Sequence, residues 1–97
     1  MEEINVQKEA ESEDELVFSV DVGGRSGTDH TVTVDQGTYE SIAPNNIGAA
    51  ELVEESFKFL LEREPKESIL TKFNLTTIGD YFPEYEEKIK TRLVNRA

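Results

Sequence analysis

Between Asn46 and Pro65 the apolar residues recur at the spacing of an amphipathic helix. At 100° per residue, one face of this helix carries Ala49, Ala50, Val53, Phe57, Leu60 and Leu61. Glutamates gather on the opposite face, which is typical of a helix that packs against a core. Asn46 is placed as an N-cap, and Pro65 ends the helix because its ring disfavours helical geometry at the preceding residue. The pattern predicts one central helix between these two positions.

Two further apolar residues of this helix, Leu52 and Phe59, lie on its flank, beyond the main apolar face. The apolar side chains within residues 69–93 are numerous enough to cover this flank. If they do not, the flank is an open docking surface for a partner protein or for a second copy of the chain. Leu52 and Phe59 are therefore the candidate partner surface.

Residues 16–35 alternate between apolar and polar positions, as β-strands do. The apolar positions are Phe18, Val20 and Val22 in the first strand and Val32 and Val34 in the second. Between the strands, the run GGRSGTD supplies the glycines that a reversing loop needs. The sequence predicts a β-hairpin packed on the central helix, then a short helical turn around Thr38–Ile42.

After Pro65 the spacing predicts two short helical pieces, over residues 66–73 and 76–82, and a last helix that opens at Pro83. The expected buried residues of the last helix are Tyr85, Ile89 and Leu93. The expected core contains Phe57, Leu60, Leu61, Phe73, Ile78, Phe82 and Ile89 together with Val20 and Val32. The fold class is α+β: an N-terminal β-hairpin on a central amphipathic helix, followed by short helices and a C-terminal helix.

Residues 1–15 contain seven acidic residues, one lysine and few apolar side chains. Such a segment buries too little apolar surface to offset the entropy of ordering it. We expect a disordered acidic tail over residues 1–15 and a single domain over residues 16–97. Ile4 and Val6 alternate with polar residues, which leaves open a third strand.

The formal net charge of −11 is unevenly distributed: residues 1–65 carry 16 acidic and 4 basic residues, and residues 66–97 carry 5 and 6. Acidic surfaces repel nucleic-acid phosphates and anionic membranes, so we expect neither as a partner. There is no cysteine, which excludes disulfides. The N-terminal run resembles neither a signal nor a transit peptide, and we expect a cytoplasmic protein.

Candidate chemistry is confined to Asp29 and His30, with Asp21 and Asp35 nearby. A metal site or general base needs further ligands or a nucleophile at hydrogen-bond distance. We expect His30 to be a surface residue at a strand start, and no catalytic residue, metal or cofactor. GGRSGT lacks the G-K-[ST] ending of a phosphate-binding loop, and TTIGDYF lacks the base-reading side chains of a recognition helix.

Residues 56–85 contain the run FKFLLEREP, a Ser-Ile-Leu triplet and a closing YFPEY. In these features the stretch resembles a group of small uncharacterised prokaryotic proteins that share FxFLLEREP, SIL and YFPxY. The resemblance implies a single small domain of prokaryotic type. No activity is established for that group, so it implies no functional residue.

Two functions remain as hypotheses. The first is a non-enzymatic protein-interaction or regulatory module. The second is a small ligand- or metal-binding protein, or a hydrolase, that uses the Asp29–His30 region. The second requires Asp21, Asp29, His30 and a helix carboxylate such as Glu64 to face one pocket.

Overall fold

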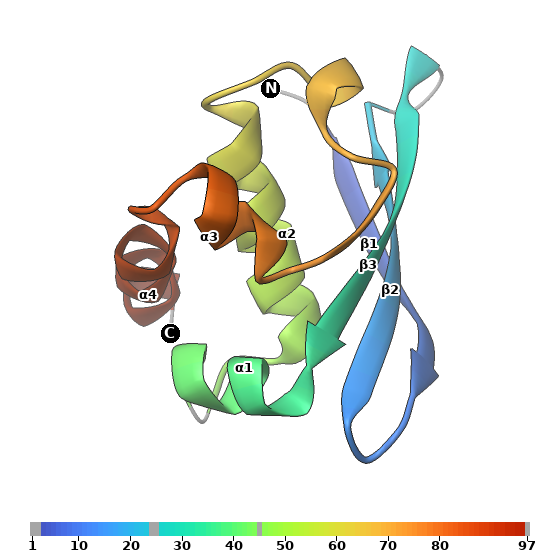
Figure 1. Cartoon of the computed structure of the whole chain (residues 1–97). Coiled ribbons are helices and arrows are strands. Elements are labelled where there is room, and N and C mark those ends of the chain that lie inside the picture. The colour runs from blue at the N-terminus through green and yellow to red at the C-terminus, as the bar shows by residue number, and fades with distance from the viewer. Residues whose placement is uncertain (1–2, 24–25, 45, 97) are drawn as a thin grey trace.

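The computed structural model describes residues 3–23, 26–44 and 46–96 and is an α+β fold in three layers. A four-stranded sheet forms one side, α2 packs against it, and α4 lies on the far side of α2 (Figure 1). The elements in chain order are β1 (Ile4–Glu11), β2 (Glu15–Val22), β3 (Thr28–Asp35), α1 (Gln36–Ile42), α2 (Ala49–Leu61), the 3₁₀ turn η2 (Lys66–Ser68), β4 (Lys72–Asn74), α3 (Thr77–Tyr81) and α4 (Tyr85–Arg96). None of the described helices is long and apolar enough to cross a bilayer.

The predicted hairpin is β2 paired antiparallel with β3, with Phe18 opposite Val32 and Leu16 opposite Val34. The predicted alternation is confirmed, because the apolar positions of both strands are buried against the helices. The intervening polar side chains face away from the helices. Arg25 and Gly24 of the predicted loop lie outside the described residues.

The third strand exists. β1 pairs antiparallel with β2 at the edge of the sheet, and Ile4 and Val6 pack against the core. The prediction of a disordered tail over residues 1–15 is therefore wrong for Ile4–Glu11, while residues 1–2 lie outside the described chain. The acidic composition of this segment suggested disorder, but the backbone hydrogen bonds to β2 form with any side chains. The glutamates of β1 charge its outer edge, which discourages pairing with other chains.

The helical piece predicted over residues 66–73 is wrong after Ser68, because only Lys66–Ser68 are helical. This segment forms η2 and then β4, which pairs in parallel with β3. The Thr31 N–H donates to the Thr71 carbonyl at 2.8 Å, and the Leu75 N–H donates to the Thr33 carbonyl at 2.9 Å. The backbone groups on the outer edge of β3 need partners, and pairing them outweighs the weak helical spacing of three apolar residues.

The central helix is confirmed as α2, although its start differs from the prediction. Gly48 is the N-cap, and its carbonyl accepts hydrogen bonds from the Glu51 and Leu52 N–H groups at 3.1 Å. Asn46, the predicted cap, is exposed in the preceding turn. Regular helix ends at Leu61, and Pro65 is in extended geometry just before η2.

Most of the expected core is buried. Phe57, Ile89, Val20 and Val32 are fully enclosed, and Leu60 and Ile78 nearly so. Leu61, Phe73 and Phe82 are only partly buried at its margin. The buried stripe of α4 is the predicted one, Tyr85, Ile89 and Leu93.

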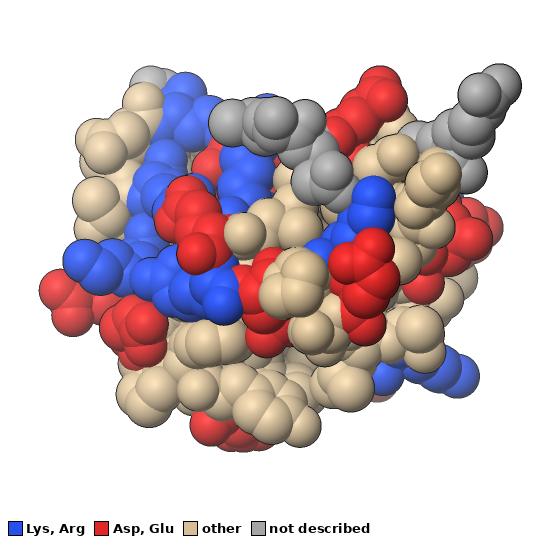
Figure 2. All heavy atoms as spheres, turned by 90° about the horizontal axis from the view of Figure 1, so that it is seen from above, with Lys and Arg blue, Asp and Glu red and all other residues tan. Residues whose placement is uncertain are grey.

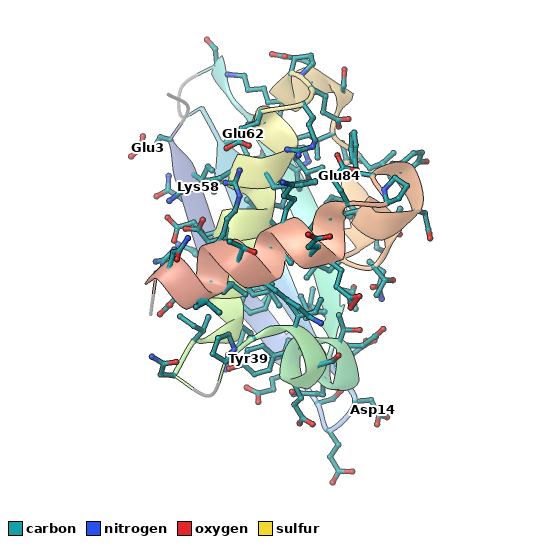
Figure 3. The ribbon with its side chains drawn as sticks, turned by 90° about the vertical axis from the view of Figure 1, so that its left-hand side faces the viewer. Glu3, Asp14, Tyr39, Lys58, Glu62 and Glu84 are labelled. Carbon is teal, nitrogen blue, oxygen red and sulfur yellow. The ribbon has the colours of Figure 1, made fainter. Side chains whose placement is uncertain are left out.

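Ion pairs connect α4 to α2, which it crosses in Figure 3. Arg96 reaches Glu55 at 2.8 Å, Glu54 at 3.2 Å and Glu51 at 3.4 Å. Near the other end of α2, Arg92 contacts Glu62 and lowers the pKa of that carboxyl. These contacts explain why an acidic helix face lies beside the basic end of α4.

Phe57 is the natural test of this core, since its ring lies 5.3 Å from His30 and 6.0 Å from Phe73. We expect Phe57→Ala to lower the free energy of unfolding by about 3–5 kcal/mol in urea titrations, because it removes a fully buried ring. Val94→Ala is the control: Val94 is 63% exposed, and its loss should change stability by at most about 0.5 kcal/mol. A loss below about 1 kcal/mol for Phe57→Ala would contradict this packing.

Candidate functional site

The candidate partner surface at Leu52 and Phe59 is not open, because both side chains are fully buried. Phe59 packs edge-on against Phe82 at 5.9 Å and Tyr85 at 5.3 Å, and the Arg63 guanidinium lies 3.6 Å above its ring. The flank is thus covered by the C-terminal segments. Of the two alternatives left open by the sequence, coverage of the flank by residues 69–93 is confirmed, so Leu52 and Phe59 belong to the core and are not a partner surface.

An apolar pocket of about 190 Å³ lies instead beside the C-terminal half of α2. The segment from η2 to α3 forms its other walls and passes in front of α2 (Figure 1). We call it the Leu70–Tyr81 pocket; it is lined by Leu60, Glu64, Ser68, Ile69, Leu70, Phe73, Thr77, Ile78, Tyr81 and Phe82. Core residues such as Leu60 and Ile78 form the bottom of the pocket. The segments just before and just after β4 form its rim.

Two large apolar side chains on this rim face solvent. Leu70 is 46% exposed and Tyr81 is 67% exposed, and the third large exposed hydrophobic residue described, Val94, lies on α4. The charged residue lining the pocket is Glu64, whose carboxylate makes no ion pair with any residue that the structure describes. Apolar groups around a hollow with few polar groups are the usual form of a binding site.

His30 is a buried residue that supports this rim, which corrects the expected surface histidine. It is 2% exposed, and its ring packs on Phe57. Nδ1 lies 2.7 Å from the Leu70 carbonyl, and Nε2 lies 2.7 Å from the Thr28 hydroxyl. A carbonyl only accepts, so Nδ1 carries the proton that bonds to it. His30 thus fastens the Leu70 backbone to β3.

The carboxylates near His30 do not converge on it. Asp29 precedes His30 in β3, so its side chain leaves the opposite face of the sheet, where it lies across from Asp21. Asp35 receives the Asn74 amide at 3.4 Å, at the other end of β3. Glu64 lines the apolar pocket, which His30 does not. The four residues required for a ligand site or hydrolase therefore do not share a pocket, and the described part of the chain holds no metal-binding cluster.

Basic side chains gather on one part of the surface, interleaved with acidic ones (Figure 2). Arg63 pairs with Glu84 at 3.2 Å, and Lys58 pairs with Glu55 at 3.2 Å. The pKa of Glu84 is lowered by a hydrogen bond from its own backbone and by Arg63. Neighbouring glutamates match these two cations, so helix packing explains their positions.

The sequence did not identify Leu70 and Tyr81 as exposed. Leu70 falls in the helical piece expected over residues 66–73 and Tyr81 in the piece expected over residues 76–82, and neither expectation separates exposed from buried positions. An extended reading of residues 69–74 would have found Leu70, because neighbours in a strand point in opposite directions. Ile69 is buried and Leu70 is exposed, as that alternation requires.

Comparison with protein-family models, with curated proteins and with solved structures finds no significant match to this chain. The resemblance of residues 56–85 to a group of small prokaryotic proteins stays a prediction.

Replacing His30 tests its role in the rim. We expect His30→Ala to lower the free energy of unfolding by about 2–4 kcal/mol, since it opens a cavity beside Phe57 and leaves the Leu70 carbonyl without a donor. His30→Asn keeps an amide donor and should lose less. Urea titration measures both losses, and NMR of the wild-type ring should show a slowly exchanging Nδ1 proton. A loss below about 0.5 kcal/mol for His30→Ala would refute the role.

Asp21 and Asp29 give a pH test. A hydrogen bond that the protonated Asp21 carboxyl donates to Asp29, partial desolvation and the repulsion between the two carboxylates raise the pKa of Asp21 above its ordinary value. The folded chain therefore holds this proton more tightly than the unfolded chain, and stability falls as pH rises through the raised pKa. We expect Asp21→Asn to raise the thermal midpoint at pH 7 and to raise it less at pH 3, where Asp21 is protonated. An equal change in the thermal midpoint at both pH values would refute the repulsion between Asp21 and Asp29.

Proposed function

We propose that this protein is a non-enzymatic protein-interaction module that docks a partner protein at the Leu70–Tyr81 pocket. The observation that carries the proposal is the exposure of Leu70 and Tyr81, at 46% and 67%, on the rim of one apolar pocket. Elsewhere the large apolar side chains described are buried or partly buried, apart from Val94. An apolar rim around a pocket is the usual anchor point of a protein interface.

The charge of the chain supports a different protein as the partner rather than a second copy. Two chains that each carry a net charge of −11 repel each other as they approach. The same charge disfavours nucleic acid and anionic membrane surfaces. The proposed partner therefore presents a neutral or basic surface, in the cytoplasm, as the sequence led us to expect.

The second hypothesis, a ligand-binding protein or hydrolase at Asp29 and His30, finds less support. Both ring nitrogens of His30 are occupied by Thr28 and Leu70, and Asp29 lies on the other face of the sheet. A general base needs a free nitrogen within reach of substrate. We therefore favour the interaction module.

The test is a capture experiment from lysate of the native host, followed by binding with purified components. Wild-type chain and Val94→Ser should retain the same partner, whereas Leu70→Ser with Tyr81→Ser should lose it. Calorimetry with the purified partner should show binding weakened about tenfold or more by Tyr81→Ser alone. Both replaced side chains are exposed, so the thermal midpoints of the variants should stay within a few degrees of wild type.

A partner that binds wild type and the pocket variants equally would refute docking at this pocket. Sedimentation equilibrium of the free chain provides the second check. A dimer lost in Tyr81→Ser would show that the pocket takes a second copy and would refute a different protein as its partner.

A further inference from the structure

The outer edge of β4 borders the Leu70–Tyr81 pocket and carries free backbone hydrogen-bonding groups. β4 is the last strand of the sheet, beside β3 only. The Thr71 carbonyl and the Leu75 N–H bond to β3, so the alternate residues, Lys72 and Asn74, turn their N–H and carbonyl groups outward. No described residue bonds to these outward groups. They are available to a further strand.

The side chains of β4 connect this edge to the pocket. Phe73 pairs with Val32 on the face of the sheet that packs against the helices, and it also lines the pocket. A strand beside β4 would place every second side chain on that same face, next to Phe73. Ile69 and Ile78 form the wall there, with Tyr81 at the rim. One added strand can thus use both the free edge and the pocket.

We propose that the occupant of this site is an extended peptide segment of the partner that adds to β4 as a fifth strand. It carries a large apolar side chain for the pocket and a lysine or arginine beside it. This rests on the proposed function. β4 is only three residues long, so backbone bonds alone give little affinity and the anchored side chain must supply the rest.

The negative charge at the pocket favours a lysine or arginine beside the apolar anchor of the peptide. The Glu64 carboxylate lines the pocket and makes no ion pair within the described residues. The net charge of −11 also draws basic segments toward the chain over long distances. An acidic extended segment of the same shape is repelled on both counts.

The outer edge of β1 is the other free edge of the sheet, and it fits this role less well. It carries Glu9 and Glu11, and its pairing with β2 shifts register between Lys8 and Ala10. Charges and irregular pairing are common protections of an edge strand. The lining residues of the Leu70–Tyr81 pocket do not include any from β1.

The experiment selects phage-displayed random dodecapeptides on the full chain, after removing those that bind the Leu70→Ser, Tyr81→Ser variant. Selected peptides should share a run of β-forming residues, one large apolar residue and an adjacent lysine or arginine. Amide signals of Lys72 and Asn74 should shift on titration with the synthetic peptide. Glu64→Gln should weaken binding about 2–5-fold.

Backbone N-methylation of the synthetic peptide decides the geometry. Methyl groups on the amides that face β4 should weaken binding tenfold or more, and those on alternate amides should have little effect. Peptides that bind the pocket as helices, or that tolerate every N-methyl group, would overturn strand addition and leave docking at the pocket intact. If no selected peptide depends on the pocket, the proposal of a peptide-binding site is refuted. The capture experiment and binding of the purified partner then test separately whether a partner docks at the pocket.

Discussion

The pairing of β4 with β3 is the contact on which the rest of this fold depends. Parallel neighbours cannot be joined by a tight turn, so the chain between them must cross over one face of the sheet. Here that crossover contains α1 and α2, and the pairing fixes α2 against the apolar face of β2 and β3. The chain then leaves β4 directly into α3, which brings Phe82 onto the flank of α2 at Phe59. The buried His30 secures the same segment through the Leu70 carbonyl.

This dependence explains which parts of the fold the sequence predicts. The α2 helix and the β2–β3 hairpin have long local periodicity, and both are confirmed. β4 has three residues, too few for any period, and its existence follows from the unpaired edge of β3. The sequence did not predict β1 firmly because its acidic composition argues against burial in a core. In the structure its backbone pairs with β2, and two apolar side chains, Ile4 and Val6, pack against the core.

The sequence left the flank at Leu52 and Phe59 undecided for the same reason. Helix periodicity tells which residues of α2 are apolar, but not how many layers cover the helix. A hairpin alone covers one side, which left a flank of α2 unassigned. In the structure the sheet covers one side of α2 and α4 covers the other, so apolar residues around a wide part of the helix circumference are buried. The apolar surface left over belongs to the short connections, where Leu70 and Tyr81 have no second layer above them.

The charged side chains have two roles, depending on whether they form ion pairs within the chain or face solvent unpaired. Arg96 pairs with glutamates of α2, Arg92 with Glu62 at the C-cap of α2, and Arg63 with Glu84 just before α4, and these pairs hold α4 across α2. They use much of the basic charge of the chain internally, so the remaining surface is dominated by carboxylates. Long-range attraction then depends on this acidic excess and weakens with salt, because exposed charges are screened within about 8–10 Å at physiological ionic strength. Retention of the proposed peptide segment would depend on the apolar pocket and the backbone of β4, which salt affects much less. In the proposed complex, electrostatic attraction would thus act during the approach of the partner and apolar contact would retain it, and the two contributions would come from different parts of the molecule.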